Sequence, residues 1–314
     1  MKRTIIISVC SLLLSTVLLC CAPLVLAGET LIGVVMTGDT PYYAEMHKAF
    51  VDTLKSSIPS GEKIEIILQR PFPDPIALSN AARKLIAADV DLIVSYGSPA
   101  TLAVIQEKSK IPHVYAGAYD PEAAKIAGAR MTGCGYKVPL SSFLRHLKSL
   151  KEIATLTVLY SGLEEDSVRQ VDELRRLAGE QGIGLQKINI TKYGDIGGIG
   201  AQLTGDAVFI TGSAVVNAWL DDILKIVKEK KVLSASILPD QNEAGVVLTL
   251  YLNPHDLGAK AAEMVARIRR GEQPEAIGSV IFRHTELVFN VREAKELGVK
   301  PSINLIAEAT KVIK

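Results

Sequence analysis

The apolar residues of this chain fall into short continuous runs, and most runs are followed by a stretch with apolar residues at helical spacing. Continuous runs, unlike alternating ones, predict strands that are covered on both faces, as in a parallel sheet with helices on each side. Strands that alternate with helices form βαβ units. Eight runs carry the pattern, namely residues 30–36, 63–69, 91–96, 113–118, 155–160, 185–190, 206–211 and 232–236.

The alternation restarts after residues 136–139, so the sequence predicts two α/β lobes. The tail contains two further strand and helix pairs, in residues 245–272 and 286–299. If both lobes are compact, this tail completes one lobe and then the other. The chain would then cross between the lobes several times.

One strand-to-helix corner occurs twice, 115 positions apart, as DLIVSYGS at residues 91–98 and DAVFITGS at residues 206–213. Ligands of open parallel sheets bind beyond the carboxyl ends of the strands, where both corners lie. Ser98 with Thr101, and Thr211 with Ser213, offer hydroxyls near helix N-termini, which favour anionic groups. The alternative is that Ser98 and Ser213 only cap their helices.

Two other corners carry candidate polar groups. Ser161, Glu164, Asp166 and Ser167 follow the strand that ends at Tyr160. Acidic residues in a first helical turn are ordinary partners of the helix dipole, which accounts for Glu164 and Glu165 but less well for Ser167. Asp120 follows a strand and precedes Pro121, which is typical of a helix N-cap. As a ligand contact, Asp120 would be a counter-charge for an ammonium group.

The first 27 residues resemble a secretory signal, with Lys2 and Arg3 before an apolar segment and a small residue at the expected cleavage point, Ala27. The alternatives are an uncleaved membrane anchor or a lipid anchor on Cys20 or Cys21. Cleavage leaves 287 residues with 33 basic and 34 acidic side chains, a net charge of −1. Such a chain has no electrostatic footprint for nucleic acid. Its one remaining cysteine, Cys134, excludes an internal disulfide.

The mature chain resembles the periplasmic substrate-binding proteins of ABC transporters, in particular the subgroup of tryptophan- and tyrosine-type binding proteins. The likeness rests on the order of several blocks: DLIVSYGSPAT, IPHVYAGAYDP, MTGCGY, YSGLEEDS, LGAKAAEMVARIRRGEQP and ELVFNVREAKELGV. It implies a type I periplasmic binding fold, the Venus flytrap, with two lobes joined by three strands. It implies a lobe of residues 28–137 and 240–283, and a lobe of residues 138–239 and 284–314.

The resemblance also implies a small solute between the lobes, delivery to an inner-membrane permease, a monomer, and neither catalysis nor a cofactor. By the family pattern, solute contacts fall on Ser98, Thr101, Asp120, Asp166, Ser167 and Thr211, and we add Thr37, Tyr42, Ser161 and Ser213 as candidates. The chain departs from the family pattern at Ser161, where Asn is usual, and at Gly212, where Asp is usual.

Two other functional classes remain open from the residues alone. A ligand sensor would use the same fold. A periplasmic hydrolase would need a nucleophile such as Cys134 or Ser98, but the chain lacks the G-x-S-x-G, P-loop and H-E-x-x-H motifs, and its five histidines have no metal-ligand spacing. We expect Trp219 to pack in a helix, and one of Tyr42, Tyr43, Tyr96 and Tyr136 to contact the solute.

Overall fold

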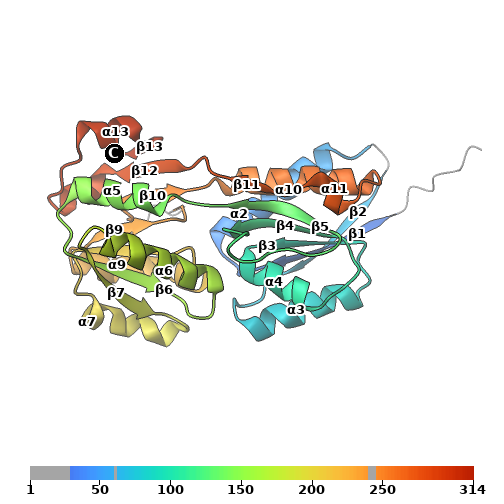
Figure 1. Ribbon diagram of the computed structural model, residues 1–314, viewed down its shortest axis with the longest axis horizontal. Helices are drawn as coiled ribbons and strands as arrows, with labels where there is room; N and C mark the ends of the chain where they lie inside the picture. Colours follow the sequence, from blue (N-terminus) through green and yellow to red (C-terminus); the bar gives the residue numbers. More distant parts are fainter. Residues whose placement is uncertain (1–28, 60–61, 240–244) are drawn as a thin grey trace, which may run out of the picture.

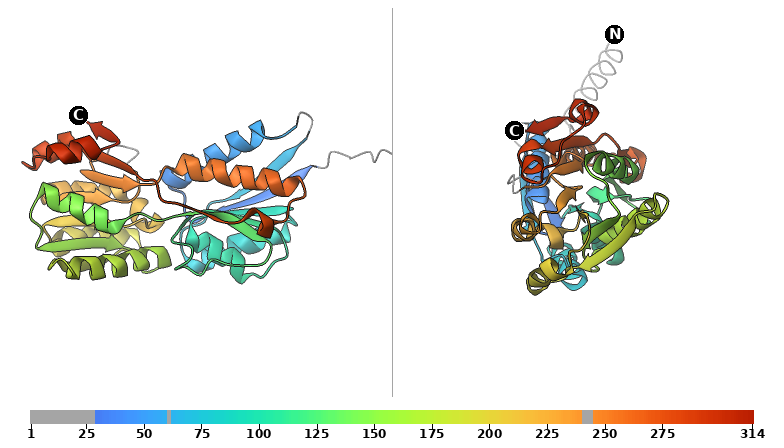
Figure 2. Two further views of the ribbon diagram at one scale, coloured as in Figure 1. Left: turned by 45° about the horizontal axis from the view of Figure 1, so that its top comes forward. Right: turned by 90° about the vertical axis from the view of Figure 1, so that its left-hand side faces the viewer.

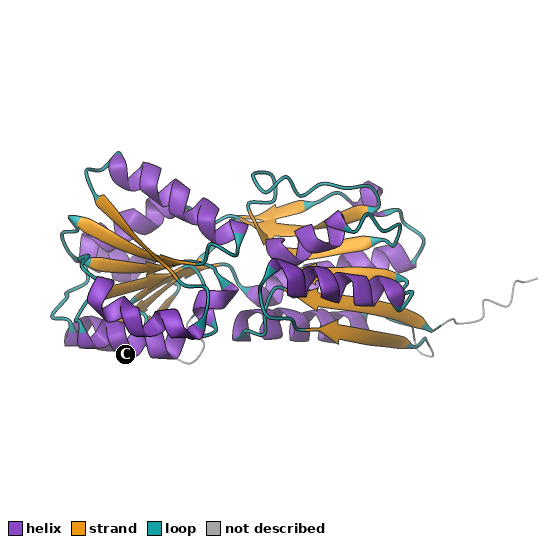
Figure 3. Cartoon of the chain, turned by 90° about the horizontal axis from the view of Figure 1, so that it is seen from below, coloured by secondary structure: helices purple, strands orange, loops and turns teal. Residues whose placement is uncertain are grey.

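The computed structural model describes residues 29–59, 62–239 and 245–314, which form two α/β lobes side by side (Figure 1). The predicted signal segment, with its alternative anchors, lies outside the described residues. In each lobe the strands form a layer between two layers of helices (Figure 3). The predicted fold class is therefore confirmed: two doubly wound lobes built around largely parallel sheets.

The first lobe contains a six-stranded sheet in the order β11-β5-β4-β3-β1-β2, with every pair parallel. Alternate residues of β1 point to opposite faces, so Val34 packs in one apolar cluster and Val35 in another. The strands are β1 (Thr30–Met36), β2 (Ile64–Gln69), β3 (Leu92–Tyr96), β4 (His113–Tyr119), β5 (Met131–Tyr136) and β11 (Val280–Phe282). The helices are α2 (Pro41–Ser56), α3 (Pro75–Ala87), α4 (Ser98–Gln106), α10 (Pro254–Arg269) and α11 (Pro274–Ile277).

The second lobe contains a seven-stranded sheet in the order β13-β12-β10-β9-β8-β6-β7. The strands are β6 (Thr155–Tyr160), β7 (Gly184–Asn189), β8 (Ala207–Ile210), β9 (Leu233–Ser236), β10 (Leu248–Tyr251), β12 (Glu286–Asn290) and β13 (Lys311–Ile313). The helices are α5 (Leu140–Leu150), α6 (Glu165–Gly179), η1 (Tyr193–Gly198), α7 (Ile199–Gln202), α8 (Ala214–Asn217), α9 (Leu220–Glu229), α12 (Val291–Glu296) and α13 (Ile303–Glu308). This sheet is not wholly parallel, because β12 runs antiparallel to β10.

The two sheets place the repeated motif at equivalent positions. In the first sheet β3 lies next to β1, whose other neighbour is β2, and in the second sheet β8 lies next to β6, whose other neighbour is β7. The aspartates that open the motif also act alike. Asp91 accepts a hydrogen bond from the amide of Leu31 (2.8 Å), and Asp206 accepts from the amide of Thr155 (3.0 Å). Each carboxylate thereby ties the start of its own strand to the neighbouring strand.

The predicted lobe boundary near residue 240 needs correction, because β10 pairs with β9 and β12 in the second sheet. The first lobe is instead rejoined by α10, which is separated from β10 by two residues. Asn253 caps this helix by accepting from the amide of His255 (3.0 Å). The chain crosses between the lobes at residues 137–139, 252–253 and 283–285 (Figure 2). The expected three crossings are present, with the second one further along the chain.

Helix α10 packs against α2 at Gly258, where a Cβ would lie 2.0 Å from the carbonyl oxygen of Met46. We therefore expect Gly258→Ala to lower the free energy of unfolding by about 2–3 kcal/mol, since backbone atoms cannot move aside as flexible side chains do. Urea unfolding followed by circular dichroism measures the change. Gly179→Ala is the matched control, because a Cβ there meets nothing within 4 Å. An unchanged midpoint for Gly258→Ala would contradict this account of the packing.

A membrane-spanning helix would need a long apolar segment, and none of the helices in residues 29–59, 62–239 and 245–314 meets that requirement.

Candidate solute-binding cleft

The candidate site lies where the carboxyl ends of the two sheets face each other. The lobes meet there through several direct contacts. The rings of Phe72 and Trp219 are 6.2 Å apart, and the Tyr119 hydroxyl donates to Glu173 across the gap (3.3 Å). A Cβ on Gly38 would lie 3.1 Å from the Cβ of Ala214. The lobes are therefore closed on each other.

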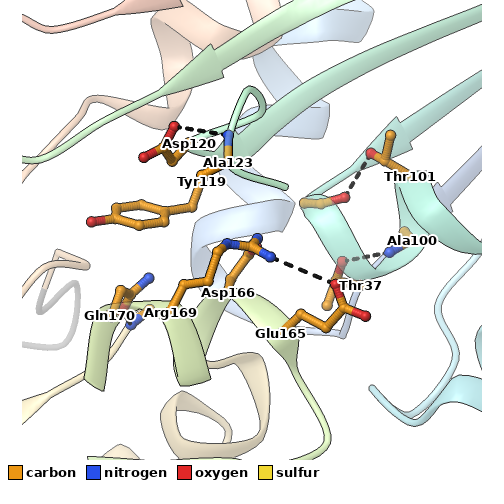
Figure 4. Close-up of polar contacts among 12 residues, drawn as sticks. Thr37, Ala100, Thr101, Tyr119, Asp120, Ala123, Glu165, Asp166, Arg169 and Gln170 are labelled. Carbon is orange, nitrogen blue, oxygen red and sulfur yellow. Dashed lines mark hydrogen bonds and ion pairs between the residues drawn. The ribbon is translucent and has the colours of Figure 1, made fainter. Parts of the chain in front are cut away.

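The first Gly-Ser corner turns sharply at Gly97, whose φ of +84° favours glycine. Thr37 fixes the start of α4, because its hydroxyl donates to the Tyr96 carbonyl (2.7 Å) and accepts from the amide of Ala100 (3.2 Å) (Figure 4). The Thr101 hydroxyl is turned into its own lobe and donates to the Gly97 carbonyl (2.7 Å). Thr37 and Thr101 thus shape the corner, while the buried Ser98 hydroxyl finds no partner in its own lobe and faces the Asp166 carboxylate of the other lobe.

Glu164, which we expected only as a partner of the dipole of its own helix, fills the second corner. Glu164 accepts hydrogen bonds from the amides of Ala214 (2.8 Å) and Val215 (3.2 Å) and from the Ser213 hydroxyl. Ser213 in turn accepts from the amide of Val216 (3.1 Å). Burial raises the pKa of Glu164 to about 7, and these hydrogen bonds only partly oppose it. The amides of this helix start are therefore engaged by the protein itself.

Ser161, Ser167 and Thr211 form one buried network in the second lobe. Thr211 donates to the Leu159 carbonyl (2.9 Å), so its oxygen accepts from the Ser167 hydroxyl (2.8 Å). Ser167 accepts from the amide of Ser161 (3.1 Å). The structure thus brings these three predicted residues together, and the network joins the start of α6 to the end of β8.

Asp166 approaches the first corner from the other lobe. Its carboxylate pairs with Arg169, the next labelled side chain of α6 (Figure 4). It also faces the hydroxyl and amide of Ser98 and the backbone of Tyr119. Burial raises the pKa of Asp166 to about 6, against the opposing effects of Arg169 and Ser98. Both Gly-Ser corners therefore have a carboxylate of the protein near their helix start, Asp166 at the first and Glu164 at the second.

Asp120 is paired differently from what we expected. Its carboxylate forms an ion pair with Lys137, at 2.6 Å, in the first crossing between the lobes. It also accepts from the amide of Ala123 (3.3 Å). Burial opposes ionisation of Asp120, but Lys137 and Ala123 hold its pKa below the usual range. The positive partner of this carboxylate is thus supplied by the crossing segment.

Buried polar atoms without a partner gather at this interface. Five such side-chain atoms occur in the described residues. Four of them, Tyr42 Oη, Ser98 Oγ, Arg169 Nε and Gln170 Nε2, lie on elements that meet between the lobes, whereas Asn290 Nδ2 lies at the end of β12. The Ser98 hydroxyl faces Asp166 and the Tyr42 hydroxyl faces Tyr136, whereas no such group is found for Gln170 Nε2 among the described residues. Since a buried unpaired polar group costs about 1–3 kcal/mol, Gln170 Nε2 in particular indicates a site for a polar ligand.

A cavity of about 390 Å³, within the size range of small-molecule sites, opens between the lobes, and of the four residues above only Tyr42 lines it. Residues 39–42 of the first lobe, residues 217–222 and 225 of the second lobe, and residues 238–239 line it. Trp219, which we expected only to pack in a helix, lines this cavity as well as packing against the second lobe.

Of the four candidate tyrosines, Tyr42, Tyr43 and Tyr136 lie close together; the rings of Tyr42 and Tyr43 are 5.4 Å apart. Tyr96 is directed away from them, and its hydroxyl lies 3.2 Å from Nδ1 of His47. That one of these rings contacts the solute stays a prediction.

Our sequence reading missed Glu164, Arg169, Gln170 and Tyr119. One signal was available for Gln170, because it follows Asp166 by four positions and therefore lies on the same face of α6. Glu164 gave no comparable signal, since its partners Ala214 and Val215 are some 50 positions away.

The structure also bears on the hydrolase alternative. Burial raises the pKa of the Cys134 thiol to about 12, and the thiol donates to the Leu257 carbonyl (3.3 Å). A thiolate nucleophile is therefore disfavoured at this position. No cluster of histidine, cysteine or acidic side chains that could hold a metal ion occurs in the described parts of the chain.

Comparisons with known proteins agree with this geometry. Three solved structures share the fold at low identity. One is a conserved domain protein from Vibrio cholerae (20% identity, TM-score 0.84, 90% of this chain and 99% of that chain). Another is an ABC domain from Streptococcus pneumoniae in complex with L-Trp (21% identity, TM-score 0.82, 91% of this chain and 100% of that chain). The third is a ligand-free, open substrate-binding protein with adhesive properties from Clostridium difficile (24% identity, TM-score 0.64, 91% of this chain and 99% of that chain).

No curated protein matches the chain. The profile of the ABC transporter substrate-binding protein family, however, matches residues 32–313. This span includes both lobes, the three crossings and the cleft. Family members are extracytoplasmic binding proteins and not enzymes. The chain therefore belongs to the family of ABC transporter substrate-binding proteins.

Proposed function

We propose that this protein captures a small polar solute, an amino acid or a similar small carboxylate, between its lobes and delivers it to the permease of an ABC transporter in the inner membrane. It acts as a monomer in the periplasm or at the extracytoplasmic surface after removal of the signal segment. The observation that carries the proposal is the cavity lined by both lobes, together with buried polar side chains at the same interface, of which Gln170 has an NH2 group that is free in the described chain. The L-Trp complex of the Streptococcus pneumoniae relative supports the amino acid class.

Closure follows from where these side chains lie. Tyr42 and Ser98 belong to the first lobe, whereas Arg169 and Gln170 belong to α6 of the second lobe. A solute that contacts both sets gains its full binding energy only when the lobes meet. Its extra affinity for the closed form therefore shifts the population toward that form.

Isothermal titration of residues 28–314 against the twenty L-amino acids and a set of small carboxylates tests the proposal. We expect at least one solute to bind with a 1:1 stoichiometry. Small-angle scattering should show a smaller radius of gyration when that solute is present. If no compound binds and none changes the scattering, the proposal is wrong.

A further inference from the structure

Gln170 lies on the face of α6 that is directed at the first lobe, beside Arg169 (Figure 4). Its side chain is fully buried, and its Oε1 accepts a hydrogen bond from the amide of Gly212 (2.8 Å). The amide group of Gln170 is therefore held against the second Gly-Ser corner.

This hydrogen bond fixes the orientation of the Gln170 amide. A backbone N–H can only donate, so the atom that faces Gly212 must be the oxygen. The NH2 group then points away from Gly212, and its nitrogen has no hydrogen-bond partner in the described residues. Fixed, buried and unpaired, this group is a donor for an external acceptor.

Next to Gly212 this donor has an uncharged hydroxyl and an apolar side chain as neighbours, and the carboxylates of Asp166 and Glu164 also act on that hydroxyl, which belongs to Tyr136. A Cβ on Gly212 would lie 3.2 Å from Gln170 Nε2 and 3.5 Å from both the Tyr136 hydroxyl and Ile237 Cδ1. Arg169, the nearest cation along the helix, is paired with Asp166 and Glu165. The helix starts that could have bound an anion are already approached by carboxylates, Asp166 at α4 and Glu164 at α8. A hydrogen-bond acceptor of the solute therefore binds to side-chain donors of the protein and not to the helix starts.

We propose that Gln170 determines the specificity of the cleft, by donating a hydrogen bond from its NH2 group to a carboxylate oxygen of the solute in the closed form. From the first lobe, the hydroxyls of Ser98, which faces Asp166, and of Tyr42, which faces Tyr136, are buried at the same interface. This inference rests on the proposed function and names the group of the solute that the second lobe recognises.

The test uses Gln170→Glu, which keeps an oxygen for the Gly212 amide but replaces the donor with a carboxylate. The probes are the best-binding L-amino acid of the titration panel and its carboxamide. We expect Gln170→Glu to weaken binding of the acid by about 100-fold, because a hydrogen bond to a charged group is lost and two carboxylates face each other. The carboxamide should lose less than about 10-fold, since its NH2 can donate to the new carboxylate.

Gln170→Met removes the donor without adding charge, and it should weaken binding of the acid by about 10-fold. Gln181→Glu is the charge control, because Gln181 is exposed and contacts Lys148 on the surface. Thermal melting verifies that each variant is folded. Binding of the acid to Gln170→Glu within threefold of wild type, or equal losses for acid and carboxamide, would overturn this inference alone. Failure of every panel member to bind the wild-type protein would overturn the proposed function and this inference with it.

Discussion

Replacing Glu164 with leucine is expected to lower the free energy of unfolding by about 3–9 kcal/mol, the sum of three losses of about 1–3 kcal/mol each. Two amides, of Ala214 and Val215, and the Ser213 hydroxyl would lose their acceptor inside the second lobe. Few domains have much more stability than about 5–15 kcal/mol, so the variant is close to unfolding. Urea unfolding at pH 7 measures the loss.

The control for this change is the neighbouring Glu165→Leu. Glu165 is exposed and contacts Arg169 at 3.6 Å, so its loss should change stability by less than about 1 kcal/mol. Equal destabilisation by both variants would contradict the role assigned to Glu164.

Glu164 also makes a pH-dependent contribution to the free energy of unfolding. Its pKa in the folded state, about 7, lies above the ordinary value of 4.5. A raised carboxyl pKa contributes stability that is fully present below pH 4.5 and is lost as the pH rises through about 7. The full contribution is about 3 kcal/mol. Glu164→Gln, which does not titrate, should therefore lack this part of the profile.

Acidification is expected to cost the protein up to about 5 kcal/mol through one buried histidine, His113. Burial lowers its pKa from 6.5 to about 3. A depressed pKa means that stability is present above pH 6.5 and is lost progressively as the pH falls toward about 3. The contribution of His113 to stability therefore changes with pH in the opposite direction to that of Glu164. The difference in stability between wild type and a His113 variant measures the contribution of His113 alone.

Protonation of His113 is unfavourable because its neutral ring belongs to a buried chain of hydrogen bonds. Thr101 donates to Gly97, so its oxygen accepts from Ser95 (2.8 Å), and Ser95 accepts from Nε2–H of His113 (2.8 Å). The neutral ring satisfies this chain, whereas a second proton would place a charge in the core. The same chain supports Thr101 and hence the corner next to Ser98.

Urea unfolding of wild type and His113→Gln between pH 7.5 and 4 measures the contribution. The glutamine keeps an N–H donor but cannot titrate, so the variant should lose less stability on acidification than wild type. His255→Gln, at an exposed position, should follow the wild-type profile. Parallel profiles for wild type and His113→Gln would show that His113 does not carry the acid sensitivity.

Much of this protein was predictable from local pattern. Continuous apolar runs such as residues 30–36 and 155–160 predicted two-sided strands, because a strand covered by helices on both faces has no polar face. The duplicated motif at residues 91–98 and 206–213 predicted equivalent corners, and the sheets place them next to β1 and β6. Ser98 was correctly located at the start of α4, but the N-cap is Gly97, so the expectation that Ser98 caps this helix was wrong.

Tertiary structure decided which polar groups remain available to a solute. Asp120 is paired with Lys137 of the crossing, and the second corner is filled by Glu164 from a distant loop. Neither pairing follows from local sequence, because hydrogen bonds and ion pairs depend on distance in space. The position of β10 in the second sheet could not be predicted for the same reason, because the apolar pattern of a strand does not specify the strands beside it. The sequence by itself thus determined the elements and their order. The pairing of buried charges, and the unpaired NH2 group of Gln170, depend on how the elements and the two lobes pack in space.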